Sequence, residues 1–391
     1  MKRLSIFSIL FLISLTVHAQ DEMFLAENIK QSPEVLKKYS GSAAKANSSI
    51  SPTKFEMVPE GEAEQIAEII TLITQLQQQR YPGSMARRGV HPKDHGCVQA
   101  KFTVNPDLPK ELQAGVLASA GKTYETWIRF SNATATVSPD IAKDGANESR
   151  GMAIKLMGVD GTTLLGKPGA KTQDFLLINQ ARFAFANVTE YLELTKIQLA
   201  NQDAVDSFFA PPLTARKKES LDIIQEIRKT QLSNPLEGRY FSASPFLFGK
   251  DTVAKFAVTP RDPVNTSMPS NPSSDYLREA LKKSLDPTNG KQAIFDFQVQ
   301  IRTTDSLPIE NASSHWGEDI APFQNVATIT IDKQDFDNPL RITECEHLVF
   351  TPWHGLAEHQ PLGGINRLRL GVYNASAQYR AQANEPSGFP K

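Results

Sequence analysis

The chain has 391 residues, of which 42 are basic and 43 acidic, giving a formal charge of −1. That balance argues against a nucleic-acid or acidic-membrane partner, because such partners normally require a basic surplus or stripe. Only Cys97 and Cys345 are present, so the chain is no disulfide scaffold. The sequence leaves open whether these two cysteines pair or remain buried free thiols.

The N-terminal segment has the pattern of a secretory signal. Lys2 and Arg3 precede an apolar run over residues 6–17, and Ala19 ends the segment with a small residue of the kind that signal peptidase reads. We expect residues 1–19 to be a cleaved signal peptide and the protein to be periplasmic or secreted. The run is too short to span a bilayer comfortably and no later stretch is apolar enough, so no membrane span is expected. Without Lys2 and Arg3, 40 basic and 43 acidic residues remain, a charge of −3.

An arm and a helix follow. Residues 20–58 are polar and lack hydrophobic periodicity, which predicts an N-terminal arm. The next segment has acidic residues in its first turn and ends at Pro82 and Gly83, which predicts an amphipathic helix. The apolar stripe of this helix consists of Ile66, Ile69, Ile70, Ile73 and Leu76.

The rest of the chain alternates between strand-like and helical patterns. Strand-like runs cover residues 98–104, 124–131, 152–157, 175–178, 292–303 and 326–331. Helical patterns cover residues 189–200 and 215–231, and a segment rich in Pro and Ser, residues 259–274, predicts a loop. No interdomain linker is evident. We therefore expect residues 59–391 to form a single α+β domain, and the strand pattern is compatible with a sheet that closes into a barrel.

The C-terminal segment carries a candidate iron ligand. If residues 365–380 form a helix, Arg369 and Tyr373 lie one turn apart and Arg380 lies on the same face. A free tyrosine has a pKa of about 10, and a neighbouring cation or a metal favours its charged form. By spacing alone, an Arg and Tyr pair is more often a surface contact.

A second candidate cluster lies near His91. His91 and His95 have the spacing of a helical zinc site, but Pro92 and Gly96 argue against a helix there. The segment instead predicts a loop that leads into a strand and presents His91 as an acid or base, with Arg88 nearby.

Two further runs, residues 129–131 and 150–155, place arginines at apolar strands. Buried arginines are costly unless they meet anions, for which haem propionates or internal carboxylates are both suitable. The chain has no Gly-x-Ser-x-Gly elbow, no phosphate-binding Gly-rich loop and no Cys-x-x-Cys-His haem attachment motif.

In this order the clusters resemble the catalase family over roughly residues 80–380. Residues 88–93 are similar to the family's distal segment Arg-x-x-His-Ala-Lys-Gly, and residues 129–131 to its Arg-Phe-Ser. Residues 150–155 match Arg-Gly-Phe-Ala-x-Lys, and residues 369–380 reproduce the spacing of the ligand helix, Arg-Leu-Phe-Ser-Tyr with another arginine seven residues later. The resemblance implies an antiparallel β-barrel core with surrounding helices.

The resemblance also implies a cofactor and residue roles. Haem b would be the cofactor, with Tyr373 as the iron ligand and Arg369 keeping the phenolate charged. His91 would move the proton of a hydroperoxide. Arg88, Arg129 and Arg380 would neutralise the propionates or brace the ligand.

A looser match adds three residues. Asp174, Asn179 and Phe183 reproduce a spacing of the family, so Asn179 is a candidate to hydrogen-bond bound peroxide; the alternative is an Asn that closes a strand in a turn. Phe183 and Phe185 are candidates to stack on the porphyrin, or core aromatics.

The departures from the family pattern limit the expected activity. Gly371 and Val372 replace the usual Phe-Ser, and the chain ends eighteen residues after Tyr373, so the long C-terminal helical region of typical catalases is expected to be missing. We expect an exported hydroperoxidase, mainly a peroxidase, that takes hydrogen peroxide or an organic hydroperoxide and a small reductant. Assembly as a homo-oligomer stays open.

Two alternatives share the haem. One is a fatty-acid hydroperoxide-transforming enzyme similar to allene oxide synthase. Those enzymes carry Thr before the distal His, where this chain has Val90 as catalases do, whereas residues 359–367 look more like that divergent branch. The other alternative is a non-catalytic haem-binding protein.

Overall fold

The computed structural model describes residues 50–82, 85–165, 171–200, 204–264 and 266–384. The expected signal peptide and residues 20–49 of the expected arm lie outside the described residues, and the division of the chain at residues 19 and 58 stays a prediction.

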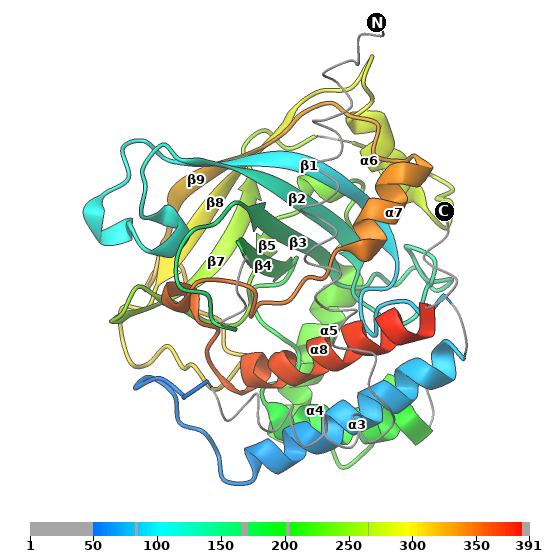
Figure 1. Cartoon of the computed structure of the whole chain (residues 1–391). Coiled ribbons are helices and arrows are strands. Elements are labelled where there is room, and N and C mark those ends of the chain that lie inside the picture. The colour runs from blue at the N-terminus through cyan, green and yellow to red at the C-terminus, as the bar shows by residue number, and fades with distance from the viewer. Residues whose placement is uncertain (1–49, 83–84, 166–170, 201–203, 265, 385–391) are drawn as a thin grey trace, which may run out of the picture.

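The core of the molecule is a closed antiparallel barrel (Figure 1). Its strands pair in the order β5-β4-β3-β2-β1-β9-β8-β7, and β5 pairs back onto β7 to close the ring, while β6 lies beside β7. The expected barrel is therefore confirmed. The strands are β1 (Asp94–Val104), β2 (Thr123–Asn132), β3 (Arg150–Met157), β4 (Thr172–Ile178), β5 (Tyr240–Phe241), β6 (Phe246–Phe248), β7 (Thr252–Pro260), β8 (Ala293–Ile301) and β9 (Phe323–Ile331).

Aromatic side chains fill the inside of the barrel. The predicted alternation in residues 292–303 is confirmed as far as residue 299, because Phe295, Phe297 and Val299 of β8 are fully buried. At the end of the strand it is wrong: Gln300 is buried, where its side chain donates to two backbone carbonyls, and Ile301 is only partly buried. The ring of Phe297 lies 4.8 Å from that of Phe175 and 5.0 Å from that of Phe102, centroid to centroid. An eight-stranded barrel is just wide enough for such side chains to fill it. A binding site is therefore to be sought outside the barrel wall.

Helices cover one side of the barrel, where Figure 1 shows α3, α4, α5 and α8 gathered together. Ile66, Ile69 and Ile70 of the predicted stripe are buried against Leu368 of the C-terminal helix. Gly371 allows this close approach, because a Cβ at that position would collide with the side chain of Ile70. The helices are α3 (Glu62–Arg80), α4 (Val188–Ala200), α5 (Ala215–Lys229), α6 (Tyr276–Ser284), α7 (Pro339–His347) and α8 (Gly364–Asn384).

The first turn of α8 is fixed by an ionic cluster. The Arg367 guanidinium pairs with Glu56, Glu62 and Glu310, at 2.6 Å for Glu62 and 2.7 Å for Glu310. Glu56 belongs to the segment expected to be an arm, so its described end is bound to the domain. No helix among the described residues is long and apolar enough to cross a membrane.

Several elements of the fold were not predicted from the sequence patterns. The short strands β5 and β6, the strand β7 and the helices α6 and α7 were not predicted. The expected loop, residues 259–274, begins in the last residues of β7 and leads to α6. The question of the cysteines is also answered, since Cys97 of β1 and Cys345 of α7 form a disulfide.

Candidate functional site

A cavity of about 550 Å³ lies between the barrel wall and the helices. Strands β2 to β4 form one side of it, and helices α3, α4, α5 and α8 line it as well. Loop residues complete the lining, among them residues 88–91 before β1 and residues 182–185 after β4. Arg129 and Ser131 of β2 reach it because they alternate with Ile128 and Phe130, which belong to the barrel core. Of the predicted site residues, those that line the cavity are Arg88, His91, Arg129, Phe183, Phe185, Arg369, Tyr373 and Arg380.

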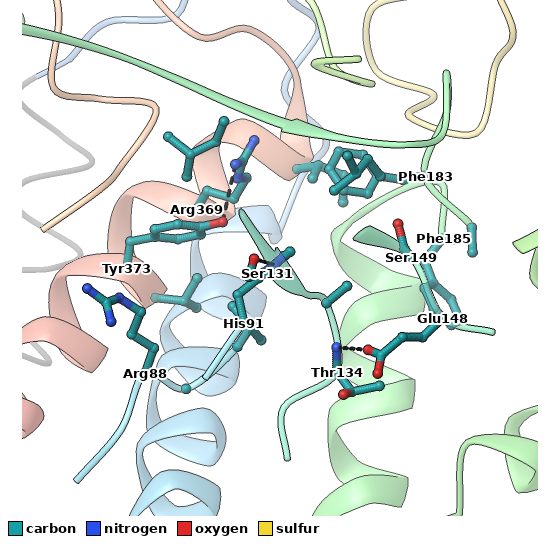
Figure 2. A pocket seen from close by; sticks show the side chains of 18 of the residues that line it. Arg88, His91, Ser131, Thr134, Glu148, Ser149, Phe183, Phe185, Arg369 and Tyr373 are labelled. Carbon is teal, nitrogen blue, oxygen red and sulfur yellow. Dashed lines mark hydrogen bonds between the residues drawn. The ribbon is translucent and has the colours of Figure 1, made fainter. Parts of the chain in front are cut away.

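His91 lies in the loop that leads into β1, as expected, and has a positive φ of 55°. Its Nδ1 lies 2.9 Å from the hydroxyl of Ser131. A Cβ added to Gly151, which pairs with Ser131, would lie 2.7 Å from the imidazole, so glycine makes room for the ring. The chain thus places His91 and Ser131 together on the cavity wall (Figure 2).

The imidazole of His91 is held neutral. Burial lowers its pKa from 6.5 to about 3, and the positive charges of Arg129, Arg369 and Arg88 lower it in the same direction. A neutral imidazole can accept a proton at neutral pH, whereas an imidazolium cannot.

Helix α8 brings Arg369 and Tyr373 to the other side of the cavity (Figure 2). The Arg369 guanidinium donates one hydrogen bond to the Tyr373 hydroxyl at 3.2 Å and another to Asn366 Oδ1 at 3.2 Å. Its centre lies 5.1 Å from the centroid of the tyrosine ring. The predicted pair is therefore in contact, with a cation directly beside the phenolic oxygen.

Positive charge is concentrated around the cavity. Arg129 is 2% exposed, and among the described residues its Nε has no hydrogen-bond partner. Burial, together with the charge of Arg88, lowers the pKa of Arg129 to about 10. Arg88 and Arg380 pair with Glu346 at 3.0 and 3.5 Å. Burial raises the pKa of Glu346, but the arginines Arg88, Arg129 and Arg380 outweigh burial and lower it to about 2.

The two phenylalanines occupy different environments. Phe185 packs edge-on against Tyr191 and Phe208, with centroids 5.4 and 5.2 Å apart, so it also serves the core between α4 and the following segment. Phe183 is less buried, and its backbone N–H donates to Ala312 O at 2.9 Å. Both rings line the cavity.

Asn179 is not brought to this cavity. It follows the last residue of β4, and its Oδ1 accepts hydrogen bonds from Arg150 N at 2.7 Å and from the Ser149 hydroxyl at 3.2 Å. It lines a separate hollow with Arg182 and Phe241. Its contacts are those of the alternative that the sequence left open, an asparagine at the end of a strand.

Neither Glu346 nor the contact of Ser131 with His91 was predicted from the sequence. Ser131 belongs to the Arg-Phe-Ser run that the sequence already indicated, but its contact with His91 was not predicted. No sequence pattern pointed to Glu346, because it lies 258 residues beyond Arg88 and meets that arginine only in the tertiary structure. Glu148, which accepts from Thr134 N at 2.7 Å at the rim, was missed as well (Figure 2).

The sequence matches no protein-family model, and no curated protein is detectably similar to it. The structure is similar to those of catalases. Catalase A from Saccharomyces cerevisiae has 15% identity and a TM-score of 0.59, and the match covers 77% of this chain and 64% of that one. A fungal catalase has 15% identity and a TM-score of 0.60, with 81% and 64% covered. A bacterial catalase has 17% identity and a TM-score of 0.56, with 86% and 66% covered.

The likeness is one of fold. The chain matches just under two thirds of the length of each of these catalases, at low sequence identity. The expected fold class, a catalase-like antiparallel barrel with surrounding helices, is confirmed.

Proposed function

We propose that this protein is an exported, haem-dependent hydroperoxidase. The observation that carries the proposal is one cavity in which the Arg369–Tyr373 pair on α8 lies across from His91, with additional arginines around it. Its substrate would be hydrogen peroxide or an organic hydroperoxide, and a small reductant would complete a peroxidase cycle.

The residues of the cavity fit haem b. Arg129 carries a buried guanidinium whose Nε has no partner among the described residues, and a buried cation of this kind calls for an anion. Haem propionates are suitable because guanidinium binds carboxylate bidentately. A volume of about 550 Å³ lies within the usual range for ligand pockets. The chain has no motif for covalent attachment, which favours haem b.

Tyr373 would hold the iron. Tyrosine is the axial ligand of catalases, and a phenolate oxygen needs a positive neighbour to remain charged in a buried site. The Arg369 guanidinium, hydrogen-bonded to the Tyr373 hydroxyl at 3.2 Å, provides that charge. Arg88, Arg129 and Arg380 would neutralise the propionates.

His91 would be the catalytic base. Bound haem would supply the redox chemistry by which the O–O bond of a hydroperoxide is broken. The imidazole, neutral because its pKa is lowered to about 3, takes the hydroperoxide proton and returns it to the departing oxygen. Ser131, 2.9 Å from Nδ1, fixes the orientation of the ring and leaves Nε2 for this exchange.

The ligand is tested by absorption and electron paramagnetic resonance spectra of the purified protein with haem b. Tyr373→Phe is expected to abolish the ferric tyrosinate signature of the wild type. Tyr379→Phe is the matched control, because Tyr379 lies on the same helix but donates its hydroxyl to Tyr81 O at 2.7 Å. A Tyr373→Phe protein with an unchanged spectrum would show that the iron has another ligand.

The activity is tested with His91→Ala. Haem content should stay near that of the wild type, while hydroperoxide consumption falls about 10²–10⁴-fold, the usual contribution of a positioned acid–base group. Equal consumption by both proteins would show that His91 is not the base, and consumption by neither protein beyond that of free haem would favour the non-catalytic haem-binding alternative. Export is checked separately by the N-terminal mass of the mature protein, for which cleavage after Ala19 is expected. The disulfide agrees with an oxidising compartment.

A further inference from the structure

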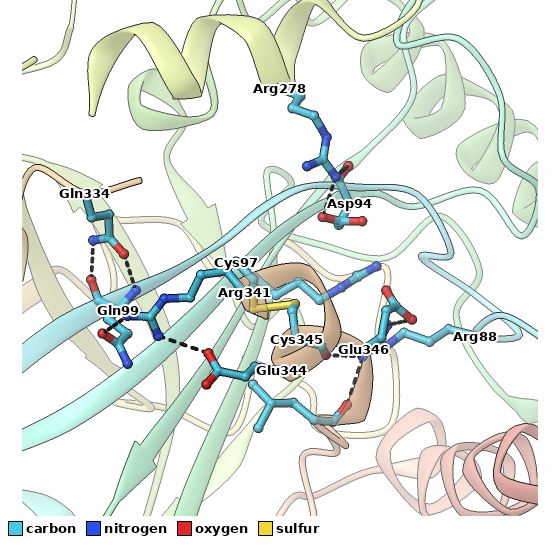
Figure 3. Close-up of a disulfide and its surroundings, with 12 residues drawn as sticks. Arg88, Asp94, Cys97, Gln99, Arg278, Gln334, Arg341, Glu344, Cys345 and Glu346 are labelled. Atoms are coloured by element: carbon cyan, nitrogen blue, oxygen red, sulfur yellow. Dashed lines mark hydrogen bonds and ion pairs between the residues drawn. A yellow bond between two sulfur atoms is a disulfide. The ribbon is translucent and has the colours of Figure 1, made fainter. Parts of the chain in front are cut away.

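We propose that the Cys97–Cys345 disulfide is a positioning device for the arginines of the cavity, so that its reduction weakens haem binding. The inference rests on the proposed function for the identity of the ligand, but its structural part, the coupling of the disulfide to Arg88, can be tested without haem. Figure 3 shows the disulfide between β1 and α7, with Arg88 and Glu346 at the end of the helix.

Helix α7 depends on the disulfide for its attachment to the barrel. Over its nine residues, all of them described, Cys345 is the buried side chain, while Leu340 and Ile342 are 63% and 43% exposed. The other attachments of α7 are mostly polar. They include Arg341, which donates to Gln99 Oε1 at 2.8 Å and lies over the Trp127 ring, and Glu346, which pairs with Arg88 and Arg380. Just beyond the helix, Leu348 packs against the small cluster around the disulfide. A short helix with so little buried apolar surface is held mainly by polar contacts once the covalent link is broken, so we expect its end to move more freely.

The end of α7 in turn holds Arg88. The Arg88 guanidinium donates hydrogen bonds to Glu346 Oε2 at 3.0 Å, to Cys345 O at 3.0 Å and to Leu348 O at 2.8 Å. All three acceptors lie within four residues of chain, and the first of these residues is the disulfide cysteine itself. Glu346 extends the link to Arg380 at 3.5 Å.

The arginines need this restraint because they repel one another. Arg88 and Arg129 line the same cavity, and the charge of Arg88 adds to the effect of burial in lowering the pKa of Arg129. Without the acceptors of α7, the Arg88 side chain would lower its electrostatic energy by turning away from Arg129 toward solvent. With them, the guanidinium is held at the cavity before an anion arrives, and less ordering entropy is lost when the anion binds.

The chemical step is a reversible thiol–disulfide exchange. A small dithiol reductant gives two electrons and two protons to the bond, the sulfur atoms of Cys97 and Cys345 become two thiols, and the reductant becomes a disulfide. Because the chain has no other cysteine, the reductant has a single target.

The experiment is a titration of apo-protein with haem b, followed at the Soret band. Two samples are compared with oxidised wild type: the double variant Cys97→Ala/Cys345→Ala, and wild type reduced with dithiothreitol and then freed of the reductant under argon. Both should bind haem about tenfold more weakly. A change of about tenfold is the lower end of the effect of residues that orient a metal site. Reoxidation should restore the affinity of the wild type.

Two controls separate positioning from general destabilisation. Glu344→Gln removes a carboxylate from the same helix that pairs with Arg341 at 3.1 Å, and it should leave haem affinity unchanged. Ile329→Val loosens the barrel core, where Ile329 is fully buried, and should lower the thermal midpoint without changing the Kd for haem.

Amide hydrogen exchange of the apo-protein provides the second readout. The Gly89 N–H, which donates to the Ser376 hydroxyl at 3.0 Å, should exchange faster in the cysteine double variant, while the amides of β8 keep the protection of the wild type. Haem binding of equal strength by the oxidised wild type and the double variant would overturn the inference. If the wild type binds no haem, the proposed function fails, and the exchange of Gly89 alone decides: faster exchange upholds the coupling of the disulfide to Arg88, and unchanged exchange refutes it.

Discussion

His91 and the arginines around it show how local charge prepares a side chain for chemistry. The imidazole faces Arg129, Arg369 and Arg88, and burial and these charges act in the same direction to keep it neutral. The same charges favour an anion at the cavity. Under the proposed function, one set of residues would provide both a proton acceptor and a binding place for propionates.

The neutral state of His91 predicts how stability depends on pH. Because the folded-state pKa of about 3 lies below the ordinary 6.5, the stabilisation is complete above pH 6.5 and is lost as pH falls toward 3. In urea unfolding of the apo-protein, the step from pH 7 to pH 4.5 should cost the wild type about 2 kcal/mol more than His91→Gln. His95 and His359, whose pKa values are also lowered, are present in both proteins and cancel. Equal losses for the two proteins would mean that His91 is not held neutral.

At the scale of elements, α8 is the part of the molecule that organises the site. It carries Arg369, Tyr373 and Arg380 on one face, and Gly371 lets it pack closely on α3. Its first turn is tied to three segments by Arg367. The position of the candidate iron ligand therefore depends on contacts two turns away from it.

Removing Arg367 should be costly for this reason. Arg367→Ala leaves Glu56 and Glu62, which are 1% and 5% exposed, without their shared cation, and breaking a buried pair in this way costs about 3 kcal/mol. The free energy of urea unfolding is the measurement. Arg341→Ala, which breaks the half-exposed pair with Glu344, serves as the comparison and should cost less than about 1 kcal/mol. Similar losses of unfolding free energy for the two variants would contradict the expected role of the Arg367 ion pairs.

At the scale of the whole molecule, the barrel is a packed support and the cavity lies between it and the helices. Under the proposed function, this arrangement would let a large planar ligand bind without opening the barrel core. The ligand would join β2 to α8 and therefore stabilise the contact between the two layers.

Haem should accordingly raise the stability of the entire chain. At a free haem concentration 100-fold above the Kd, the free energy of unfolding is expected to rise by about 2.7 kcal/mol over that of the apo-protein. The measurement is urea unfolding with and without haem b, followed by far-ultraviolet circular dichroism. Tyr373→Phe should lose part of this increase at the same haem concentration, whereas a full increase in that variant would argue that haem binds elsewhere.

The sequence alone determined the parts of the site that depend on short spacings. Arg88 and His91 are three residues apart, Arg369 and Tyr373 are four apart, and backbone geometry over one turn or one loop fixes how such neighbours lie. Strand alternation likewise identified β8, because one face of it is less buried than the other. In β7 the six residues 253–258 are all buried, so no alternation was visible, and β5 is only two residues long.

Only the tertiary structure decided which distant segments meet. The pairing of Cys97 with Cys345, the approach of Glu346 to Arg88 and the position of Asn179 away from the cavity all depend on strand register and on the closure of the barrel. These contacts join residues that hydrophobic periodicity, a short-range property, does not relate. The Arg369–Tyr373 pair was therefore readable in the sequence, while the disulfide and the carboxylate that complete the arginine cluster were not.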